Sequence, residues 1–172
     1  MKAKDTMAIV KASYKRSPQW GKLAIKYMQR AEGKNGKREV PTLFNFDGAM
    51  ERKEAYQVIH EAKKGSYFFR FLISPDPVKE DTNRDIFLRE VTEKTMLGVE
   101  DCVGQQIQWV AATHDDHAPH RHVHVLAILP KRLQVQDLQE MRQSATEAAL
   151  FQRRQRDAIY EARQKQERGK KE

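Results

Sequence analysis

The chain has 172 residues, one cysteine and a formal net charge of +8 at pH 7. This length suits a single domain with a hydrophobic core, and the lone Cys102, expected to be a small buried hydrophobic residue, argues against a disulfide scaffold or a cysteine-based metal site. With no apolar run that could span a membrane and no signal-peptide core, we expect a cytoplasmic protein without a membrane partner, and the positive charge favours a polyanion such as nucleic acid.

The first part of the chain predicts a strand over residues 7–14 and then a short helix. Ser17 supplies an N-cap and Pro18 suits the first helical position. Apolar residues recur at helical intervals, which predicts one face turned toward the core: Trp20, Leu23, Ala24 and Tyr27. A basic, glycine-containing stretch over residues 30–38 follows and suits phosphate binding.

The middle of the chain predicts two helices around one central strand. Residues 41–47 are expected to form a loop or a short edge segment. A second helix is predicted from residue 47 to about residue 64, with Gly65 as its stop signal. The nearly continuous aromatic and aliphatic run over residues 67–74 predicts a central strand. A third helix is predicted over residues 81–103.

Two further strands, residues 106–114 and 122–129, predict an antiparallel hairpin, and a long polar helix follows over residues 136–166. This order predicts an α+β fold: a single, mostly antiparallel sheet of four to five strands with helices packed mostly on one face. We assign residues 1–132 to the core and residues 133–172 to a charged helix and tail of the same domain.

Five of the six histidines lie between residues 114 and 124. Because side chains alternate along a strand, His122 and His124 share one face, while the intervening valines face the core. His114 ends the adjacent strand, where opposed side chains lie about 5 Å apart. Three neutral imidazoles can therefore converge on one divalent metal and leave positions open for water or substrate.

Several alternatives for this site stay open. Asp116, or Asp115, could orient one imidazole through its second nitrogen. The overlapping pair His120 and His122 could replace His122 and His124, and His117 is a weaker ligand candidate. Mg²⁺ or Mn²⁺ is the expected metal, with Zn²⁺, Ni²⁺ or Co²⁺ as alternatives. Structural zinc usually has four ligands that include cysteine.

His114 together with the His122-Val123-His124 triplet resembles the third motif of the conjugative relaxases, the mobilisation nucleases of the HUH endonuclease superfamily. The resemblance implies a sheet with helices, cleavage of single-stranded DNA with a divalent metal, and a nucleophilic tyrosine near the N-terminus. The stretch K-Y-M-Q-R-A-E-G resembles the tyrosine motif of that family. By this similarity Tyr27 is the nucleophile and Arg30 contacts DNA.

Other residues are candidates on the same resemblance. Ser74 matches a serine that contacts DNA in the second motif of the family, although S-P-D-P is also an ordinary turn. Tyr14 and Tyr160 are alternative nucleophiles, Tyr160 because related replication initiators and transposases carry their tyrosine after the histidine pair. The basic loop residues expected to follow a single strand of DNA are Lys34, Lys37 and Arg38.

The resulting hypothesis is site- and strand-specific nicking and rejoining of single-stranded DNA at an origin of transfer, in plasmid or mobile-element transfer. Tyr27 would form a 5′-phosphotyrosine, Asp116 would support the metal centre, and accessory DNA-processing proteins would be partners. Two other classes stay open. One is a metal-dependent hydrolase in which water replaces Tyr27 as nucleophile, and the other is a non-catalytic basic DNA-binding module with a structural metal.

Overall fold

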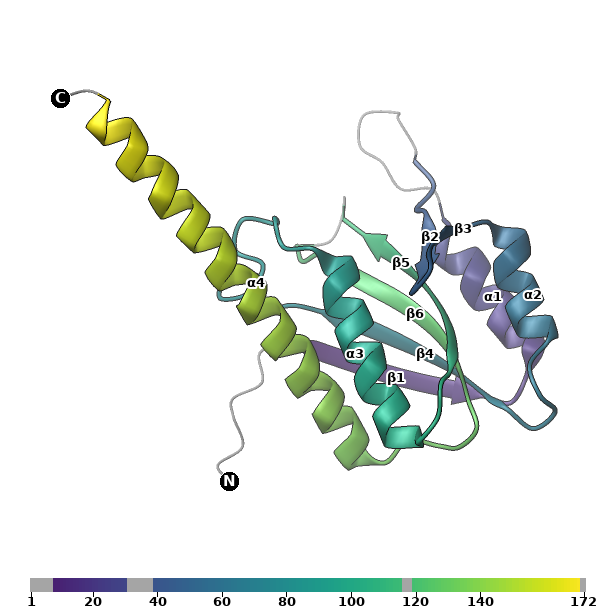
Figure 1. Cartoon of the computed structure of the whole chain (residues 1–172). Coiled ribbons are helices and arrows are strands. Elements are labelled where there is room, and N and C mark those ends of the chain that lie inside the picture. The colour runs from purple at the N-terminus through teal and green to yellow at the C-terminus, as the bar shows by residue number, and fades with distance from the viewer. Residues whose placement is uncertain (1–7, 31–38, 116–118, 171–172) are drawn as a thin grey trace.

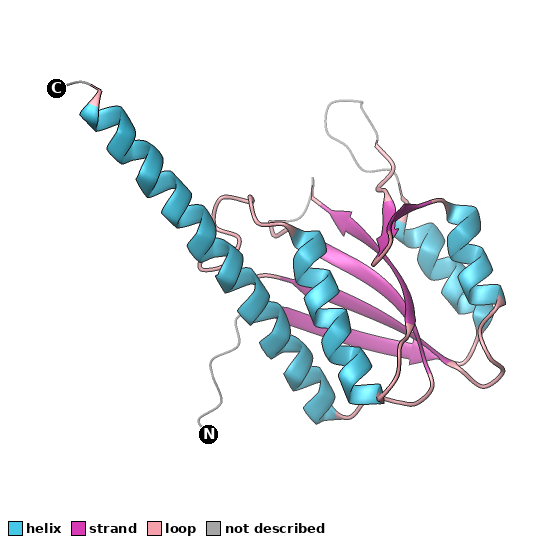
Figure 2. Cartoon of the chain, viewed as in Figure 1, coloured by secondary structure: helices cyan, strands magenta, loops and turns pink. Residues whose placement is uncertain are grey.

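The structure is a computed structural model that describes residues 8–30, 39–115 and 119–170. Within these residues, one open antiparallel sheet of six strands is combined with four helices (Figure 1, Figure 2). The elements are, in chain order, β1 (Ile9–Lys15), α1 (Pro18–Met28), β2 (Leu43–Asn45), β3 (Gly48–Met50), α2 (Arg52–His60), β4 (Tyr67–Ser74), α3 (Leu88–Val103), β5 (Gln108–His114), β6 (His122–Leu129) and α4 (Val135–Gly169). The strand order is β1-β4-β6-β5-β2-β3.

The predicted α+β class and antiparallel sheet are confirmed, but the sheet has six strands and not four to five. The additional strands are β2 and β3, a hairpin that extends the sheet because Leu43 and Phe44 pair with β5. Its turn is stabilised by the Asp47 amide, which donates to the Asn45 side chain at 2.9 Å. The turn also requires Gly48, whose φ of 126° disfavours a side chain. Consequently α2 begins at residue 52 and not at residue 47.

Helices cover both faces of the sheet, so the prediction that they pack mostly on one face is wrong. One face packs against α3 and α4, and the other packs against α1 and α2 (Figure 1). The reason lies in the strands, because consecutive β4 residues point to opposite faces and each set includes large apolar side chains. Phe69 and Phe71 enter the larger core under α3 and α4, whereas Phe68 enters the smaller core under α1 and α2.

The third helix begins at Leu88 and not at Asp81, because residues 75–87 form a loop held by its own carboxylates. The Asp76 carboxylate accepts the backbone amides of Val78 and Lys79 at 2.9 and 2.8 Å. Aspartates that bind nearby amides in this way compete with helix formation. Thus this loop lies beside the start of β6, to which it is tied by an ion pair described below.

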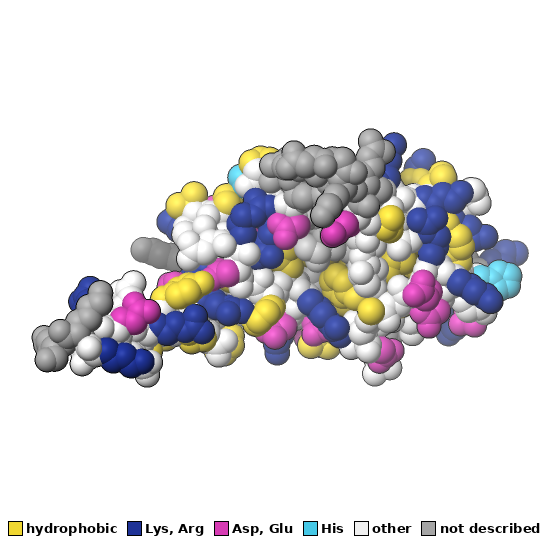
Figure 3. Space-filling view, turned by 90° about the horizontal axis from the view of Figure 1, so that it is seen from above, with side chains coloured by type: hydrophobic (Ala, Val, Ile, Leu, Met, Phe, Trp, Pro, Cys, Tyr) yellow, Lys and Arg dark blue, Asp and Glu magenta, His cyan; other side chains and the backbone are white. Residues whose placement is uncertain are grey.

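The C-terminal helix α4 belongs to the core over its first half only. Met141, Ala145 and Ala149 are buried in the larger core, whereas the second half of α4 extends past the sheet (Figure 1). Basic and acidic side chains are interspersed along this protruding end (Figure 3). No helix in the described ranges is long and apolar enough to cross a bilayer.

Candidate metal centre

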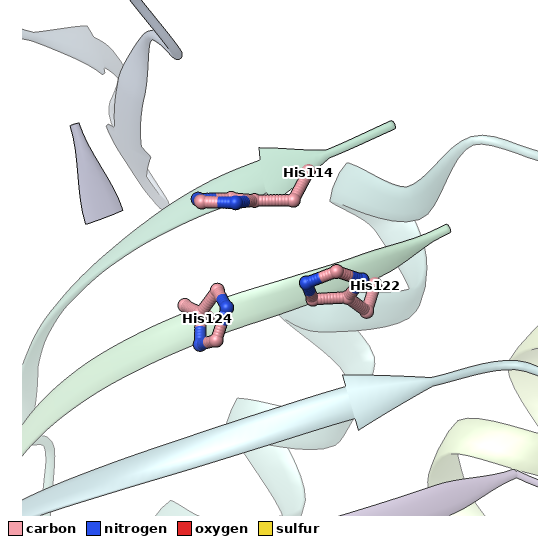
Figure 4. A group of neighbouring side chains, drawn as sticks. All are labelled: His114, His122 and His124. Atoms are coloured by element: carbon pink, nitrogen blue, oxygen red, sulfur yellow. The ribbon is translucent and has the colours of Figure 1, made fainter. Parts of the chain in front are cut away.

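Three histidines converge where β5 ends and β6 begins (Figure 4). The antiparallel register places His114 directly opposite His122, and His124 follows on the same face of β6. The ring centroids lie 5.4 Å apart for His114 and His122, 4.7 Å for His114 and His124, and 4.9 Å for His122 and His124. Each ring offers a nitrogen within 4.8 Å of those of the other two. The predicted convergence of these three residues is therefore present in the structure.

Backbone carbonyls orient two of the three rings. His114, only 5% exposed, places Nε2 at 2.9 Å from the carbonyl oxygen of Met28, the last residue of α1. Nδ1 of His122 lies 3.3 Å from the carbonyl oxygen of His120. Because a carbonyl oxygen only accepts, these two nitrogens carry protons, and the other ring nitrogens, Nδ1 of His114 and Nε2 of His122, are the atoms that could face a metal. Such contacts fix the orientation of metal-binding imidazoles.

Burial keeps two of the three rings, those of His122 and His124, in the uncharged form that a metal needs. It lowers the pKa of His124 to about 3, with further contributions from the charges of His114, His122 and Arg70. It also holds the pKa of His122 below its usual value, again with the charges of its histidine neighbours acting in the same direction. Both rings are therefore neutral near pH 7, so their lone pairs are available to a divalent cation. The three histidines could hold a divalent metal ion, and imidazole nitrogens suit Zn²⁺, Ni²⁺ or Co²⁺ better than Mg²⁺, which prefers oxygen ligands.

A second group that could hold a cation consists of Cys102 with Asp137 and Glu140. The Cys102 thiol is half-buried and lies 3.4 Å from a Glu140 oxygen, so the prediction of a buried hydrophobic cysteine is wrong. Burial and these carboxylates raise the pKa of Cys102 to about 12, which keeps the thiol protonated. Asp137 meanwhile caps α4 by accepting the Gln134 amide at 2.6 Å. The histidine trio is therefore the better metal site.

Tyr27 lies beside the histidine trio. Its ring contacts that of His124 at right angles, with centroids 5.4 Å apart, and its side chain is 42% exposed. The guanidinium carbons of Arg30 and Arg70 lie 5.6 and 5.3 Å from the Tyr27 ring centroid. A phenol, two cations and three imidazoles therefore meet on one face of the sheet.

The buried face of α1 is rotated from the predicted one, since Ala24 is buried and Trp20 partly buried as predicted but two other predicted residues are not. Tyr27 and Leu23 are exposed, whereas the buried residues of α1 are Gly21, Ala24, Ile25 and Met28. Gly21 explains the rotation, because a Cβ there would lie 3.1 Å from a ring carbon of Phe68. The small face lets α1 approach the sheet closely, and this orientation turns Tyr27 outward to the histidines.

The two alternative tyrosines are associated with the opposite face of the sheet. Tyr14 stacks on Phe69, a residue of the larger core, with ring centroids 4.9 Å apart. Tyr160 on α4 donates its hydroxyl to the Asp85 carboxylate at 2.8 Å. Of the three tyrosines considered, Tyr27 alone contacts a ring of the trio.

Some of the remaining predicted residues lie within the described ranges, and others lie outside them. Ser74 is buried and its hydroxyl donates to the Arg121 carbonyl at 3.3 Å, so it supports the start of β6. His120 contributes its carbonyl to the centre, while the trio itself uses His114, His122 and His124. The predicted residues that lie outside the described ranges are Lys34, Lys37, Arg38, Asp116 and His117.

Two features of the site were not predicted from the sequence. Arg121, between two histidines, forms a two-bond ion pair with Asp81 in which both distances are 2.7 Å, and also donates to the Ile86 carbonyl. Alternation along β6 implies that Arg121 points away from the histidine face, but nothing local identifies a partner 40 positions earlier. The second feature is Arg70, which the sequence shows as a lone cation within the apolar run of β4.

Comparison with protein-family models, curated proteins and solved structures finds no match to this chain. The site itself combines three converging imidazoles, a partly exposed phenol in contact with one of them, and adjacent guanidinium groups.

Proposed function

We propose that this protein nicks and rejoins single-stranded DNA as a relaxase-like transesterase, at an origin of transfer of a plasmid or another mobile element. The observation that supports this most directly is the contact between the Tyr27 ring and His124 of the histidine trio. The motif resemblance to the HUH endonucleases points to the same pair of groups. The proposal includes a cytoplasmic location and accessory DNA-processing partners.

In the proposed reaction, the Tyr27 oxygen attacks a phosphorus atom of the DNA strand. A bond forms between this oxygen and phosphorus as the bond from phosphorus to the 3′ oxygen breaks. The phenol loses its proton, the departing 3′ oxygen takes up a proton, and the 5′ end stays attached to Tyr27. Because one phosphodiester replaces another, the released 3′-hydroxyl can attack in turn and rejoin the strand.

The surrounding side chains suit this chemistry. A divalent ion held by His114, His122 and His124 would withdraw charge from the phosphate oxygens. Arg30, with its guanidinium near the Tyr27 ring, adds a fixed positive charge where negative charge develops. The partial exposure of Tyr27 leaves the phenol accessible to a strand arriving from solvent.

The experiment uses a pool of random-sequence single strands, each labelled at the 3′ end, with Mn²⁺. Cleavage by Tyr27 transfers the labelled 3′ portion to the protein, which then migrates as a fluorescent band in a denaturing gel. Tyr27→Phe should abolish that band, while Tyr14→Phe and Tyr160→Phe should keep it. Cleavage without any protein-linked band would contradict the proposal and indicate hydrolysis by water, and the absence of both cleavage and a band would contradict it as well.

A further inference from the structure

Arg70 is a half-buried cation near the candidate metal centre. It lies in the middle of β4, directly opposite Leu126 of β6, and its neighbour Leu72 is directly opposite His124. The side chain of Arg70 therefore points to the same face of the sheet as His124. This position inside an otherwise apolar strand is costly for a charge unless something compensates it.

No carboxylate forms an ion pair or hydrogen bond with Arg70 in the ranges that the structure describes. Two arginines with even less exposure, at 11% and 7% of the side chain, do have such partners. Arg121 pairs with Asp81 at 2.7 Å, and Arg153 pairs with Asp85 at 2.6 Å. Both of those ion pairs tie down the loop over residues 75–87 and so have a structural role. Arg70 has a different environment.

Two aromatic rings hold the Arg70 guanidinium in place. Its central carbon lies 5.3 Å from the ring centroid of Trp20 and 5.3 Å from that of Tyr27, two residues of α1 that lie seven positions apart. Contacts with ring faces stabilise the cation and restrict its orientation, yet they do not use the hydrogen-bonding capacity of its five N–H groups. A positioned guanidinium of this kind matches the geometry of a phosphate.

The surface next to Arg70 is open and basic. Ser13 of β1 is directly opposite Arg70, and Lys11 and Lys15 flank it on the same face of the sheet. All three β1 residues are exposed, because the smaller core under α1 and α2 contains no residue of β1. Cations beside an aromatic side chain such as Trp20 are the combination that binds single-stranded nucleic acid.

We propose that Arg70 binds a backbone phosphate of single-stranded DNA and so positions the strand for attack by Tyr27. This inference rests on the proposed function and adds a DNA path, from the exposed face of β1 across Arg70 to Tyr27. The phosphate held by Arg70 neighbours the one that reacts, because the histidine trio and Arg30 serve the reacting group. Arg70 therefore contributes mainly to binding.

The test measures binding of a fluorescein-labelled oligothymidylate strand in EDTA, where no cleavage occurs, by anisotropy over a range of salt concentrations. Arg70→Gln should weaken binding about tenfold. It should also reduce the slope of log affinity against log salt by about 0.7, the value for one phosphate contact on a single strand. Arg70→Lys should keep most of the slope while losing affinity, because it keeps the charge and loses the planar fork.

Arg156 provides the matched control, because it too is partly buried and its guanidinium lies over an aromatic ring, Phe87, at 4.4 Å. It is carried by α4, on the other face of the sheet, so Arg156→Gln should leave both affinity and salt slope unchanged. A Co²⁺ titration of Arg70→Gln should reach one bound ion per chain, as in the unaltered protein, which shows that the fold and the histidine trio are intact.

The outcomes separate this inference from the proposed function. If the unaltered protein forms the covalent band but Arg70→Gln binds with unchanged affinity and slope, the role of Arg70 is wrong and the nicking activity stands. If Arg70→Gln loses affinity and slope but no covalent band forms in the unaltered protein, Arg70 is a DNA contact and the proposed nicking is wrong. Failure of the unaltered protein to bind oligothymidylate would overturn the Arg70 inference directly.

Discussion

The two faces of the sheet use charge in opposite ways. On the face covered by α3 and α4, buried ionisable groups have protein partners: Arg121 with Asp81, Arg153 with Asp85, and Glu80 with Thr146. On the face covered by α1 and α2, the histidine trio and Arg70 lie beside Tyr27 at the margin of a smaller core. The comparison indicates that the first face provides rigidity and the second provides groups that can bind an external ligand.

We expect the largest effect on stability from a substitution on the face covered by α3 and α4. Arg121→Gln removes one partner of an ion pair in which the side chains are only 11% and 4% exposed, so Asp81 stays buried without its counterion. We expect the free energy of unfolding to fall by about 3 to 5 kcal/mol, measured by urea denaturation. The control is Arg89→Gln in the exposed pair Arg89–Glu93, which should lower it by about 1 kcal/mol or less. Equal effects of the two substitutions would contradict a structural role for the buried pair.

The buried carboxyl group of Glu80 makes the stability of the same face depend on pH. Burial raises its pKa to about 7 from a usual value of 4.5, with the negative charges of Asp76 and Asp81 acting in the same direction and hydrogen bonds from the Asp76 backbone and Thr146 opposing them. Between these two pH values the folded state holds a proton that the unfolded state has released. The free energy of unfolding therefore falls as pH rises through this window, by about 3 kcal/mol for this one group, and is constant with respect to Glu80 above it.

Glu80→Gln removes this dependence. The difference between the free energy of unfolding of Glu80→Gln and that of the unaltered protein should rise by about 3 kcal/mol between pH 4.5 and pH 7.5. Urea denaturation at each pH measures both free energies. Glu147→Gln, at an exposed position on α4, is the control for the loss of a carboxylate. If the free energies of unfolding of Glu80→Gln and the unaltered protein change in parallel through this pH window, Glu80 is ionised in the folded protein at neutral pH and the prediction is wrong.

Local signals in the sequence predicted part of this architecture. Ser17 caps α1 through the Trp20 amide at 3.3 Å, as the Ser-Pro pair indicates, and the apolar run over residues 67–74 forms β4. The convergence of the trio followed from strand alternation within one hairpin, where the partners are near in sequence. These features depend on residues close along the chain, so the sequence carries them directly.

The features that were missed depend on distant partners or on very short elements. The three-residue strands β2 and β3 are too short to show a period. β2 lies in the segment expected to be a loop or a short edge segment and becomes a strand because it pairs with β5, and β3 becomes one because it pairs with β2. The orientation of α1 is set by the close approach of Gly21 to Phe68, which hydrophobic periodicity does not register. Arg70 gains its significance from Trp20 and Tyr27, which a different element supplies.

The smallest of these effects concerns the face that carries the histidine trio. His124→Ala removes one of three imidazoles and should weaken Co²⁺ or Mn²⁺ binding about 100-fold, or about 2.7 kcal/mol, measured by calorimetric titration. Its effect on the unfolding free energy without metal should be smaller than that of Arg121→Gln, because a half-buried, uncharged ring is removed and no buried ion is left unpaired. His60→Ala is the control, since His60 is exposed at the end of α2 and lies outside the trio. If His124→Ala destabilises the metal-free protein as strongly as Arg121→Gln while leaving metal affinity unchanged, the trio is a structural element and the contrast between the two faces does not hold.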